Sequence, residues 1–149
     1  MSEFNVRKSQ LDDLDEIARI YANEVLHGLA TFETKPPPAN ELALRRMAIL
    51  TANLPYIVAS IDNHVVGFAY ASPYRARAAY QNSIENSVYV DSKARQQGVG
   101  SILLETLIHS CEHGPWRQMI AVIGDSNNLG SIALHKKLGF RHVGTIEAV

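Results

Sequence analysis

The sequence has few cysteines and no long apolar runs. Cys111 is the only cysteine among 149 residues, so the chain can form no internal disulfide and contains no Cys-x-x-Cys metal motif. A reducing compartment is therefore permitted, and we expect a cytoplasmic protein. No apolar stretch approaches the roughly 20 residues that span a bilayer, and the N-terminal stretch MSEFNVRKSQ lacks the apolar core of a secretory signal. We expect no membrane partner.

An excess of charge of one sign is also absent. The chain has 14 Lys and Arg residues against 15 Asp and Glu, a net charge of −1, and no long run of like charges. Nucleic acids bind mainly through basic surfaces, so we expect no nucleic-acid partner and favour a small molecule. With 46% hydrophobic residues, the length suits a single domain, residues 1–149, with a sizeable core.

Apolar periodicity and turn residues divide the chain into alternating strands and helices. The predicted strands are 4–7, 56–61, 65–71, 84–90, 118–123 and 140–146, and the predicted helices are 9–26, 40–50, 98–113 and 129–138. Ser9 is the expected cap of the first helix, and three prolines place 31–38 in a loop. Strands 56–61 and 65–71 flank Asp62-Asn63, which predicts a hairpin. The order indicates an α/β protein with a mixed sheet.

Two glycines, Gly98 and Gly100, stand where the third helix begins. Backbone N–H groups at a glycine-rich helix start, together with the helix dipole, form an anion site that suits a phosphate or pyrophosphate. The pattern is not a P-loop, because no Gly-Lys-Ser/Thr follows, and Leu103 replaces the third glycine of a dinucleotide fingerprint. The alternative is that the glycines only relieve packing between strand and helix.

Several motifs follow one another in a characteristic order: Val88-Tyr-Val90, then Arg95-x-x-Gly98-x-Gly100, then Asn128-x-x-Ser131-x-x-Leu134-His135-x-x-Leu138-Gly139-Phe140. This combination resembles the GNAT superfamily of N-acetyltransferases. Segments 31–37, 74–80 and 84–90 are similar, more narrowly, to phosphinothricin and methionine-sulfoximine acetyltransferases. The resemblance covers most of the chain and implies a mixed, mostly antiparallel sheet flanked by helices on both faces.

The resemblance also implies acetyl-CoA as co-substrate and transfer of its acetyl group to the α-amine of a small amino acid or analogue, of the phosphinothricin, methionine sulfoximine or methionine sulfone type. The pyrophosphate is expected on the amides of 96–101, and the pantetheine alongside 88–90. Asn128 is expected to cap the last helix and to contact the cofactor, and the adjacent Asn127 could replace it in either role. The predicted cofactor-binding residues are Val88, Tyr89, Val90, Arg95, Gln96, Gln97, Gly98, Val99, Gly100, Ser101 and Asn128.

Amide formation from a thioester needs a neutral amine, a polarised carbonyl and a proton for the departing thiolate. Glu85 matches the position of the family's proposed base, although it could be only an exposed carboxylate on a strand. Main-chain N–H groups near Tyr89 and Val90 could hold the thioester oxygen. His135 stands where many superfamily members have a tyrosine and could protonate the thiolate without being indispensable. The alternative for His135 is a packed side chain.

The expected substrate-binding residues surround the acceptor: Phe32, Arg75, Arg77, Tyr80, Glu85 and Tyr89. An arginine fork suits a carboxylate or phosphinate, and aromatic rings can wall a small pocket. By composition alone, Arg75 and Arg77 would belong to a solvated loop. The remaining histidines do not cluster with carboxylates, so we expect no metal.

The family's chain usually continues beyond a segment like Gly144–Val149 into a strand that completes the sheet and often the dimer contact. This sequence stops there, so we expect either a shortened chain or a sheet edge completed by another chain, and a homodimer. Two alternative functions remain open. One is acetyl transfer to another amine, such as an antibiotic or a protein N-terminus. The other is a non-catalytic acyl-CoA-binding sensor, which would not need Glu85.

Overall fold

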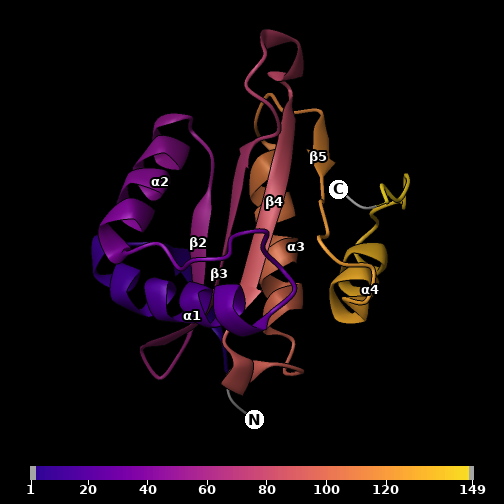
Figure 1. The fold of residues 1–149 in the computed structure, drawn as a ribbon. Coiled ribbons are helices and arrows are strands. Elements are labelled where there is room, and N and C mark those ends of the chain that lie inside the picture. Colours follow the sequence, from indigo (N-terminus) through magenta and orange to yellow (C-terminus); the bar gives the residue numbers. More distant parts are fainter. Residues whose placement is uncertain (1–2, 148–149) are drawn as a thin grey trace.

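The computed structural model describes residues 3–147, and residues 1–2 and 148–149 lie outside the described part (Figure 1). Neighbouring strands are antiparallel except β4 and β5, which are parallel, so the expected mixed, mostly antiparallel sheet is confirmed. The sheet has the order β1-β2-β3-β4-β5, with β1 at Asn5–Lys8, β2 at Tyr56–Ile61, β3 at His64–Pro73, β4 at Ser83–Val90 and β5 at Gln118–Ile120.

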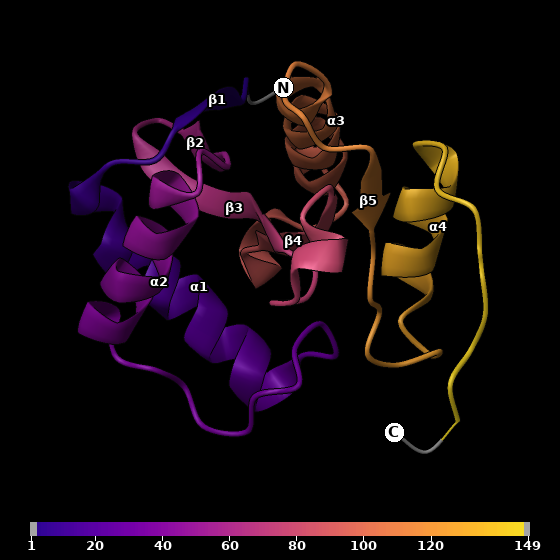
Figure 2. The same cartoon turned by 90° about the horizontal axis from the view of Figure 1, so that it is seen from above.

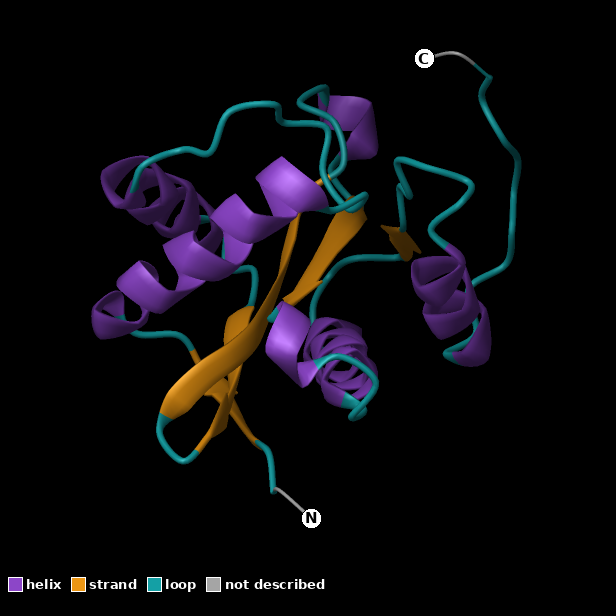
Figure 3. Cartoon of the chain, turned by 60° about the horizontal axis from the view of Figure 1, so that its bottom comes forward, coloured by secondary structure: helices purple, strands orange, loops and turns teal. Residues whose placement is uncertain are grey.

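Helices cover both faces of this sheet, as expected (Figures 1 and 3). Helices α1 and α2 lie on one face and α3 on the other, while α4 lies beside β5 (Figure 2). No helix in the described part of the chain is long and apolar enough to cross a membrane. The helices span Leu14–His27 (α1), Ala39–Thr51 (α2), Val99–Glu112 (α3) and Leu129–Lys137 (α4), and short 3-10 turns occupy Leu11–Asp13, Ala78–Tyr80 and Ser92–Ala94.

The core forms on both sides of the central strands. Ile17 of α1 and Leu103 of α3 are fully buried, and Phe68 of β3 is 2% exposed. Gly67 lets α3 approach the sheet closely, because a Cβ there would lie 2.9 Å from a Leu103 methyl. This close approach fixes where α3 begins relative to β3 and β4.

The local turn chemistry follows the sequence at two places. Asp62 and Asn63 adopt positive φ angles of 50° and 65°, which suit a tight β-hairpin turn, and the predicted hairpin is confirmed. The three prolines lack amide donors, and α2 begins directly after the last of them, Pro38. The loop predicted for 31–38 is therefore confirmed.

The predicted Ser9 cap is wrong. Gln10 and Asp13 form the capping box instead, at the start of the 3-10 turn that leads into α1. Ser9 is buried, and its Oγ accepts a hydrogen bond of 2.8 Å from Arg46 Nε on α2. The tertiary contact with Arg46 takes the hydroxyl that local sequence would assign to the helix.

Two strand predictions also need correction. β5 ends at Ile120, not at residue 123, because it pairs only with the first three residues of β4. Residues 140–146 form no strand, although their apolar side chains predicted one. Val143 and Ile146 are 85% and 81% exposed, and the sheet of the described chain contains no strand from this segment. A strand is not stable without a neighbouring strand to satisfy its N–H and C=O groups.

Candidate active site

Strand β4 has an edge that β5 leaves partly uncovered. The parallel pairing of the two strands ends at Glu85 and Ile120, although β4 continues to Val90. No strand within residues 3–147 pairs with 86–90 on this side, which we call the open edge of β4.

Hydrogen bonds at its two ends fix how β4 is oriented. Tyr74 N donates to Ser83 O at 3.1 Å, and Asp91 N donates to Val66 O at 2.8 Å. Backbone groups alternate along an antiparallel ladder, so odd-numbered residues bond toward β3 and even-numbered residues point to the open edge. The N–H and C=O groups of Val88 and Val90 are therefore available there. The N–H of Tyr89 points toward β3, which leaves Val90 as the amide suited to hold a thioester oxygen.

Side chains of β4 alternate between the two sheet faces. Tyr89 packs against Tyr21 of α1, with ring centroids 5.1 Å apart. Val90 instead lies near Gly100 of α3, and Asn86 bonds to α4. Glu85 thus shares the α1–α2 face with Tyr89, while Asn86, Val88 and Val90 share the α3–α4 face.

A strained turn leads from β4 to α3. Gln96 has a φ of 63°, and Gly98, the N-cap of α3, has a φ of 85°. Both lie in the left-handed region, which glycine tolerates and other residues rarely adopt. We call Arg95–Gly98 the glycine turn. Successive backbone N–H groups in a turn with left-handed residues can form the concave site that binds anions.

The start of α3 has unused hydrogen-bond donors. No side chain in the described part of the chain caps this end, and the first helical bond runs from Ile102 N to Gly98 O at 3.1 Å. The N–H groups of Val99, Gly100 and Ser101 therefore lack acceptors within the helix. Together with the helix dipole, they favour a bound phosphate.

Internal packing alone does not explain the glycines. A Cβ on Gly98 would meet nothing within 4 Å, and one on Gly100 would make only ordinary contacts with Leu134 and Val90, at 3.4 and 3.6 Å. The backbone angle accounts for Gly98. Nothing inside the described chain requires Gly100, whose missing side chain keeps the first turn of α3 accessible next to the open edge.

Glu85 lies where β4 and β5 separate. Its side chain is 28% exposed, and burial raises the pKa of its carboxyl above the ordinary value, opposed by the charge of Arg75. Arg75 NH1 lies 3.8 Å from Glu85 Oε1. A carboxylate with a raised pKa is a stronger base, which suits it to remove a proton near neutral pH.

His135 is 8% exposed and is held at both ring nitrogens. Its Nδ1 lies 2.7 Å from Ser131 O, which can only accept, so Nδ1 carries the proton. Its Nε2 lies 3.1 Å from Asn86 Nδ2, which can only donate, so Nε2 accepts. Burial lowers the pKa of His135. The neutral ring thus couples α4 to β4, and proton donation by His135 stays a prediction.

Asn128 caps α4, as expected, because its side chain accepts a hydrogen bond of 3.3 Å from Ser131 N. Asn127 does not take this role. Its N–H donates to Asp125 at 2.8 Å in the preceding turn. Contact of Asn128 with a cofactor stays a prediction.

The loop after β3 brings several predicted acceptor residues together. The Arg75 guanidinium lies 3.9 Å above the Tyr74 ring, and Tyr80 packs edge-on against the same ring at 5.8 Å. Arg75 also faces Glu85, so Arg75, Tyr80 and Glu85 form one cluster. Arg77 begins the 3-10 turn and is exposed.

Two other predicted acceptor residues lie apart from this cluster. The Tyr89 ring is 8% exposed and packs in the core against Phe68 and Tyr21, and burial raises its pKa. Phe32 is 68% exposed, and its ring covers Gly124, between β5 and α4. The structure therefore separates Phe32 and the Tyr89 ring from the Arg75 cluster.

Sequence reasoning missed the network that holds the α1–α2 loop, Gly28–Pro38. Arg45 of α2 donates two hydrogen bonds to the Glu33 carboxylate, at 2.8 and 2.9 Å, which lowers the pKa of Glu33. Tyr21 Oη contacts Glu33 and lies 2.8 Å from Thr31 Oγ1. Burial, followed by the bond to Glu33, raises the pKa of Tyr21 to about 12.

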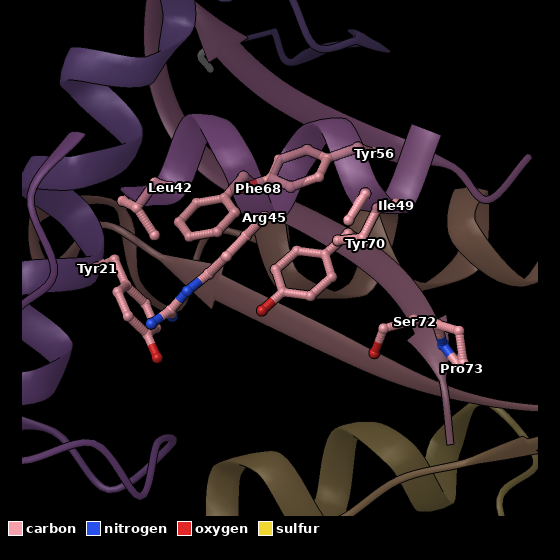
Figure 4. A pocket seen from close by; sticks show the side chains of 10 residues that line it. Tyr21, Leu42, Arg45, Ile49, Tyr56, Phe68, Tyr70, Ser72 and Pro73 are labelled. Atoms are coloured by element: carbon pink, nitrogen blue, oxygen red, sulfur yellow. The ribbon is translucent and has the colours of Figure 1, made fainter. Parts of the chain in front are cut away.

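A pocket of about 380 Å³ lies beside this network (Figure 4). Tyr56 and Tyr70 stack at 4.9 Å along it, and Arg45 and Tyr21 extend over the same hollow in Figure 4. Ser72, which lines the pocket, pairs with Glu85 across β3 and β4. The pocket therefore opens on the sheet face that carries the Glu85 carboxylate.

One of the missed residues left a signal in the sequence. Asn86 is a polar residue between Ile84 and Val88 on one strand face, where an unpaired amide would be costly. Arg45 and Glu33 left no such signal, because their pairing depends on where α2 lies. Within residues 3–147, no group of three His, Cys, Asp or Glu side chains could hold a metal ion.

Known proteins are similar to this chain in sequence and fold. The family model described as the acetyltransferase (GNAT) family matches residues 14–140. A phosphinothricin N-acetyltransferase of Alcaligenes faecalis is 48% identical, covering 97% of this chain and 73% of the relative. An L-methionine sulfoximine/L-methionine sulfone acetyltransferase of Pseudomonas aeruginosa is 32% identical, covering 97% and 84%.

Among solved structures, a phosphinothricin acetyltransferase of Sinorhizobium meliloti in complex with acetyl-CoA superposes with a TM-score of 0.91. It is 42% identical, covering 97% of this chain and 77% of that one. The family match spans the glycine turn, the open edge of β4 and the helix that carries His135. The chain belongs to the acetyltransferase (GNAT) family.

Proposed function

We propose that this protein is an N-acetyltransferase that transfers the acetyl group of acetyl-CoA to the α-amine of a small amino acid or analogue, of the phosphinothricin, methionine sulfoximine or methionine sulfone type. The observation that carries the proposal is that the open edge of β4, the uncapped start of α3 and the Glu85 carboxylate lie along one strand. The open edge of β4 runs into the uncapped start of α3 on one side, and Glu85 stands on the other face of the same strand.

The described residues fit acetyl-CoA. Its pyrophosphate suits the N–H groups of 96–101, where the Gly98 and Gly100 positions leave space. Its pantetheine amides suit the unpaired N–H and C=O groups of Val88 and Val90 at the open edge. Arg95, Gln97 and Asn128 complete the proposed cofactor-binding set.

Acetyl-CoA supplies an activated acetyl group as a thioester. Glu85, directly or through water, accepts the proton of the acceptor ammonium, and the free amine attacks the thioester carbon. The N–H of Val90 holds the oxygen while the C–N bond forms and the C–S bond breaks. The attacking nitrogen releases its second proton to water as the amide forms, and the departing thiolate takes a proton from water or from His135. Glu85 and Asn86, the partner of His135, are adjacent in β4, so Glu85 and His135 lie on opposite faces of the sheet.

The acceptor is proposed to lie on the α1–α2 face, where Glu85 can reach its amine. Arg75 and Arg77 would bind its acidic group, and Tyr80 would wall the side chain. Phe32 would cover the acceptor from the α1–α2 loop. The Tyr89 ring would support the acceptor site from within the core, through its packing against Tyr21. The pocket beside Ser72 offers room for the side chain of the acceptor.

The test is a turnover assay that follows thiol release from acetyl-CoA. The panel contains phosphinothricin, methionine sulfoximine, methionine sulfone, the common L-amino acids and a peptide with a free N-terminus. We expect turnover with at least one amino-acid-like acceptor and little with the peptide. Efficient turnover with the peptide alone would assign the enzyme to a different acceptor class. Binding of acetyl-CoA without turnover of any amine would favour the sensor.

We also propose that residues 1–149 form one acetyltransferase domain and that the protein is a cytoplasmic homodimer. Two large apolar side chains on α2, Leu44 and Met47, are 63% and 62% exposed in the single chain, which supports a self-association surface. The single, buried Cys111 is compatible with a reducing compartment. Sedimentation equilibrium of the wild type and of Leu44→Glu measures the oligomeric state and tests whether α2 is the interface.

A further inference from the structure

Glu24 is a buried carboxylate near the C-terminal end of α1, and its side chain is 8% exposed. Its Oε2 accepts a hydrogen bond of 2.9 Å from Arg95 NH2, in the glycine turn. Its Oε1 accepts one of 3.0 Å from Ala30 N, in the α1–α2 loop. A single carboxylate therefore joins Ala30 to Arg95, which are 65 residues apart in the sequence.

We propose that Glu24 is a positioning residue that links the glycine turn to the α1–α2 loop. The inference rests on the proposed function, in which the glycine turn binds acetyl-CoA and the α1–α2 loop covers the acceptor. Because both segments bond to the Glu24 carboxylate, a displacement of either segment moves the hydrogen-bond acceptor of the other. The two substrates are thereby bound in one relative geometry, which transfer between them requires.

Gly28 makes room for this carboxylate. A Cβ at position 28 would lie 2.0 Å from Glu24 Oε1 and 2.2 Å from its Cδ. The backbone of Gly28 is extended, with φ −101° and ψ −178°, a conformation open to any residue. Glycine is therefore needed here for space and not for backbone freedom. An alanine would displace the carboxylate while leaving its charge and the helix in place.

Because Glu24 is buried, losing either of its hydrogen bonds is expected to destabilise its carboxylate. A buried charge that loses one partner is left undercompensated, which is costly because the interior solvates ions poorly. The Arg19–Asp91 ion pair offers a matched comparison, since it also joins α1 to the segment before the glycine turn, with N···O 3.0 Å. Arg19 is 54% exposed and bonds to neither the glycine turn nor the α1–α2 loop.

The first experiment needs no ligand. Amide hydrogen exchange of Ala30 is compared between wild type, Arg95→Ala and Arg19→Gln. We expect Arg95→Ala to accelerate exchange at Ala30 about 5-fold or more, because Glu24 loses its charge partner, and Arg19→Gln to leave it unchanged. Unchanged exchange in Arg95→Ala would overturn the link, whether or not the protein binds acetyl-CoA.

The second experiment uses Glu24→Gln and Gly28→Ala. We expect each variant to raise both the Kd for acetyl-CoA and the acceptor KM by about 5- to 20-fold, with a smaller change in kcat, while Arg19→Gln changes neither by more than about 2-fold. A purely structural role would lower the melting temperature without this paired effect. If Glu24→Gln does not fold, the proposal is tested by the Kd and KM of Gly28→Ala, because that variant retains the Glu24 carboxylate.

An effect on only one substrate, or on neither, in a folded variant would overturn the proposal. If the wild type itself binds no acetyl-CoA, the proposed function fails, and the Ala30 exchange still decides whether Glu24 links the two segments.

Discussion

The two faces of β4 differ in the kind of group they present. On the α3–α4 face, Val88 and Val90 contribute apolar side chains and the Asn86 amide is already bonded to His135, so the polar groups available at the adjoining open edge belong to the backbone. On the α1–α2 face, Glu85 stands near Arg75, and the Tyr89 ring packs against Tyr21 farther along the strand. A site built from backbone groups depends little on side-chain identity, whereas a site built from side chains can change its specificity by substitution.

The segments next to each face differ in the same way. The glycine turn has a distinctive backbone conformation, with left-handed angles at Gln96 and Gly98, and one side-chain ion pair, Arg95–Glu24. The α1–α2 loop is held by side chains, chiefly the Glu33–Arg45 ion pair. Apart from changes at Glu24 and Gly28, which we propose to affect both substrates, we therefore expect substitutions to separate into those that affect acetyl-CoA and those that affect acceptor or chemistry.

The largest expected effect is that of Glu85→Gln. Loss of a general base lowers kcat by about 10²- to 10⁴-fold, and acetyl-CoA binding should stay unchanged, because the carboxylate is not at the open edge. The raised pKa means that the folded state disfavours the ionised form, so the variant should be at least as stable as the wild type at neutral pH. Single-turnover kinetics, calorimetry and thermal melts measure these three quantities.

Alkaline pH should partly rescue Glu85→Gln, because more of the amine arrives without its proton. If Glu85→Gln kept a near-normal kcat from pH 6 to 9, with chemistry rate-limiting, the Glu85 carboxylate would not be the base. The α1–α2 face of β4 would then supply no catalytic group.

The next largest effect is expected for Gly100→Val, which should weaken acetyl-CoA binding because it adds a side chain in front of the first turn of α3. Each charge-assisted bond lost to the pyrophosphate corresponds to about 10- to 100-fold in Kd. Acetyl-CoA should therefore no longer raise the melting temperature. Gly98→Val should abolish the same shift and also destabilise the protein by about 1–2 kcal/mol, since valine disfavours a left-handed φ.

Gly130→Ala is a suitable control, because a Cβ there also meets nothing within 4 Å. An intact acetyl-CoA shift in both Gly98→Val and Gly100→Val would show that the phosphates bind elsewhere.

Arg75→Ala tests the acceptor face with a smaller effect. We expect the acceptor KM to rise by about 10-fold, with acetyl-CoA affinity nearly unchanged. The positive charge of Arg75 lowers the pKa of Glu85, so its removal should move the acidic limb of the pH–rate profile to higher pH. Arg77→Ala, farther along the loop, should raise the acceptor KM without moving that limb. Equal losses for both substrates would indicate a structural role for Arg75.

The smallest effect on rate is expected for His135→Gln. The proton sits on Nδ1 and the pKa is lowered, so few molecules carry an acidic proton on Nε2 at neutral pH, and kcat should fall by less than about 10-fold. A loss of 100-fold or more, with the fold intact, would make His135 an essential acid.

The stability of the protein gives a second measure of His135. A lowered folded pKa means that the unfolded chain binds more protons, so stability should decline as pH falls below the ordinary value of 6.5. Thermal melts between pH 5 and 7 should show this decline in the wild type and in the exposed control His27→Gln, and less of it in His135→Gln.

Much of the fold was predictable, because most elements have strong local signals. The apolar spacing of α1 and α3, the hairpin turn at Asp62-Asn63 and the prolines before α2 all act over a few residues. The helix start at Gly98 was predictable for the same reason, since glycine has no side chain to cap the helix, whereas the left-handed φ of Gln96 was not predicted. The strand at 140–146 was predicted wrongly because a strand needs a partner that local sequence does not supply.

The sequence by itself determined the helix start at Gly98, the cap at Asn128 and the placement of Glu85 and Asn86 on opposite faces of one strand. Period-two alternation decides that placement without any long-range contact. Only the tertiary structure decided that His135 bonds to Asn86, that Arg45 holds Glu33 and that Glu24 reaches both Arg95 and Ala30. These pairs join residues from different elements, and their side chains meet only where packing of the helices on the sheet brings them within hydrogen-bond distance.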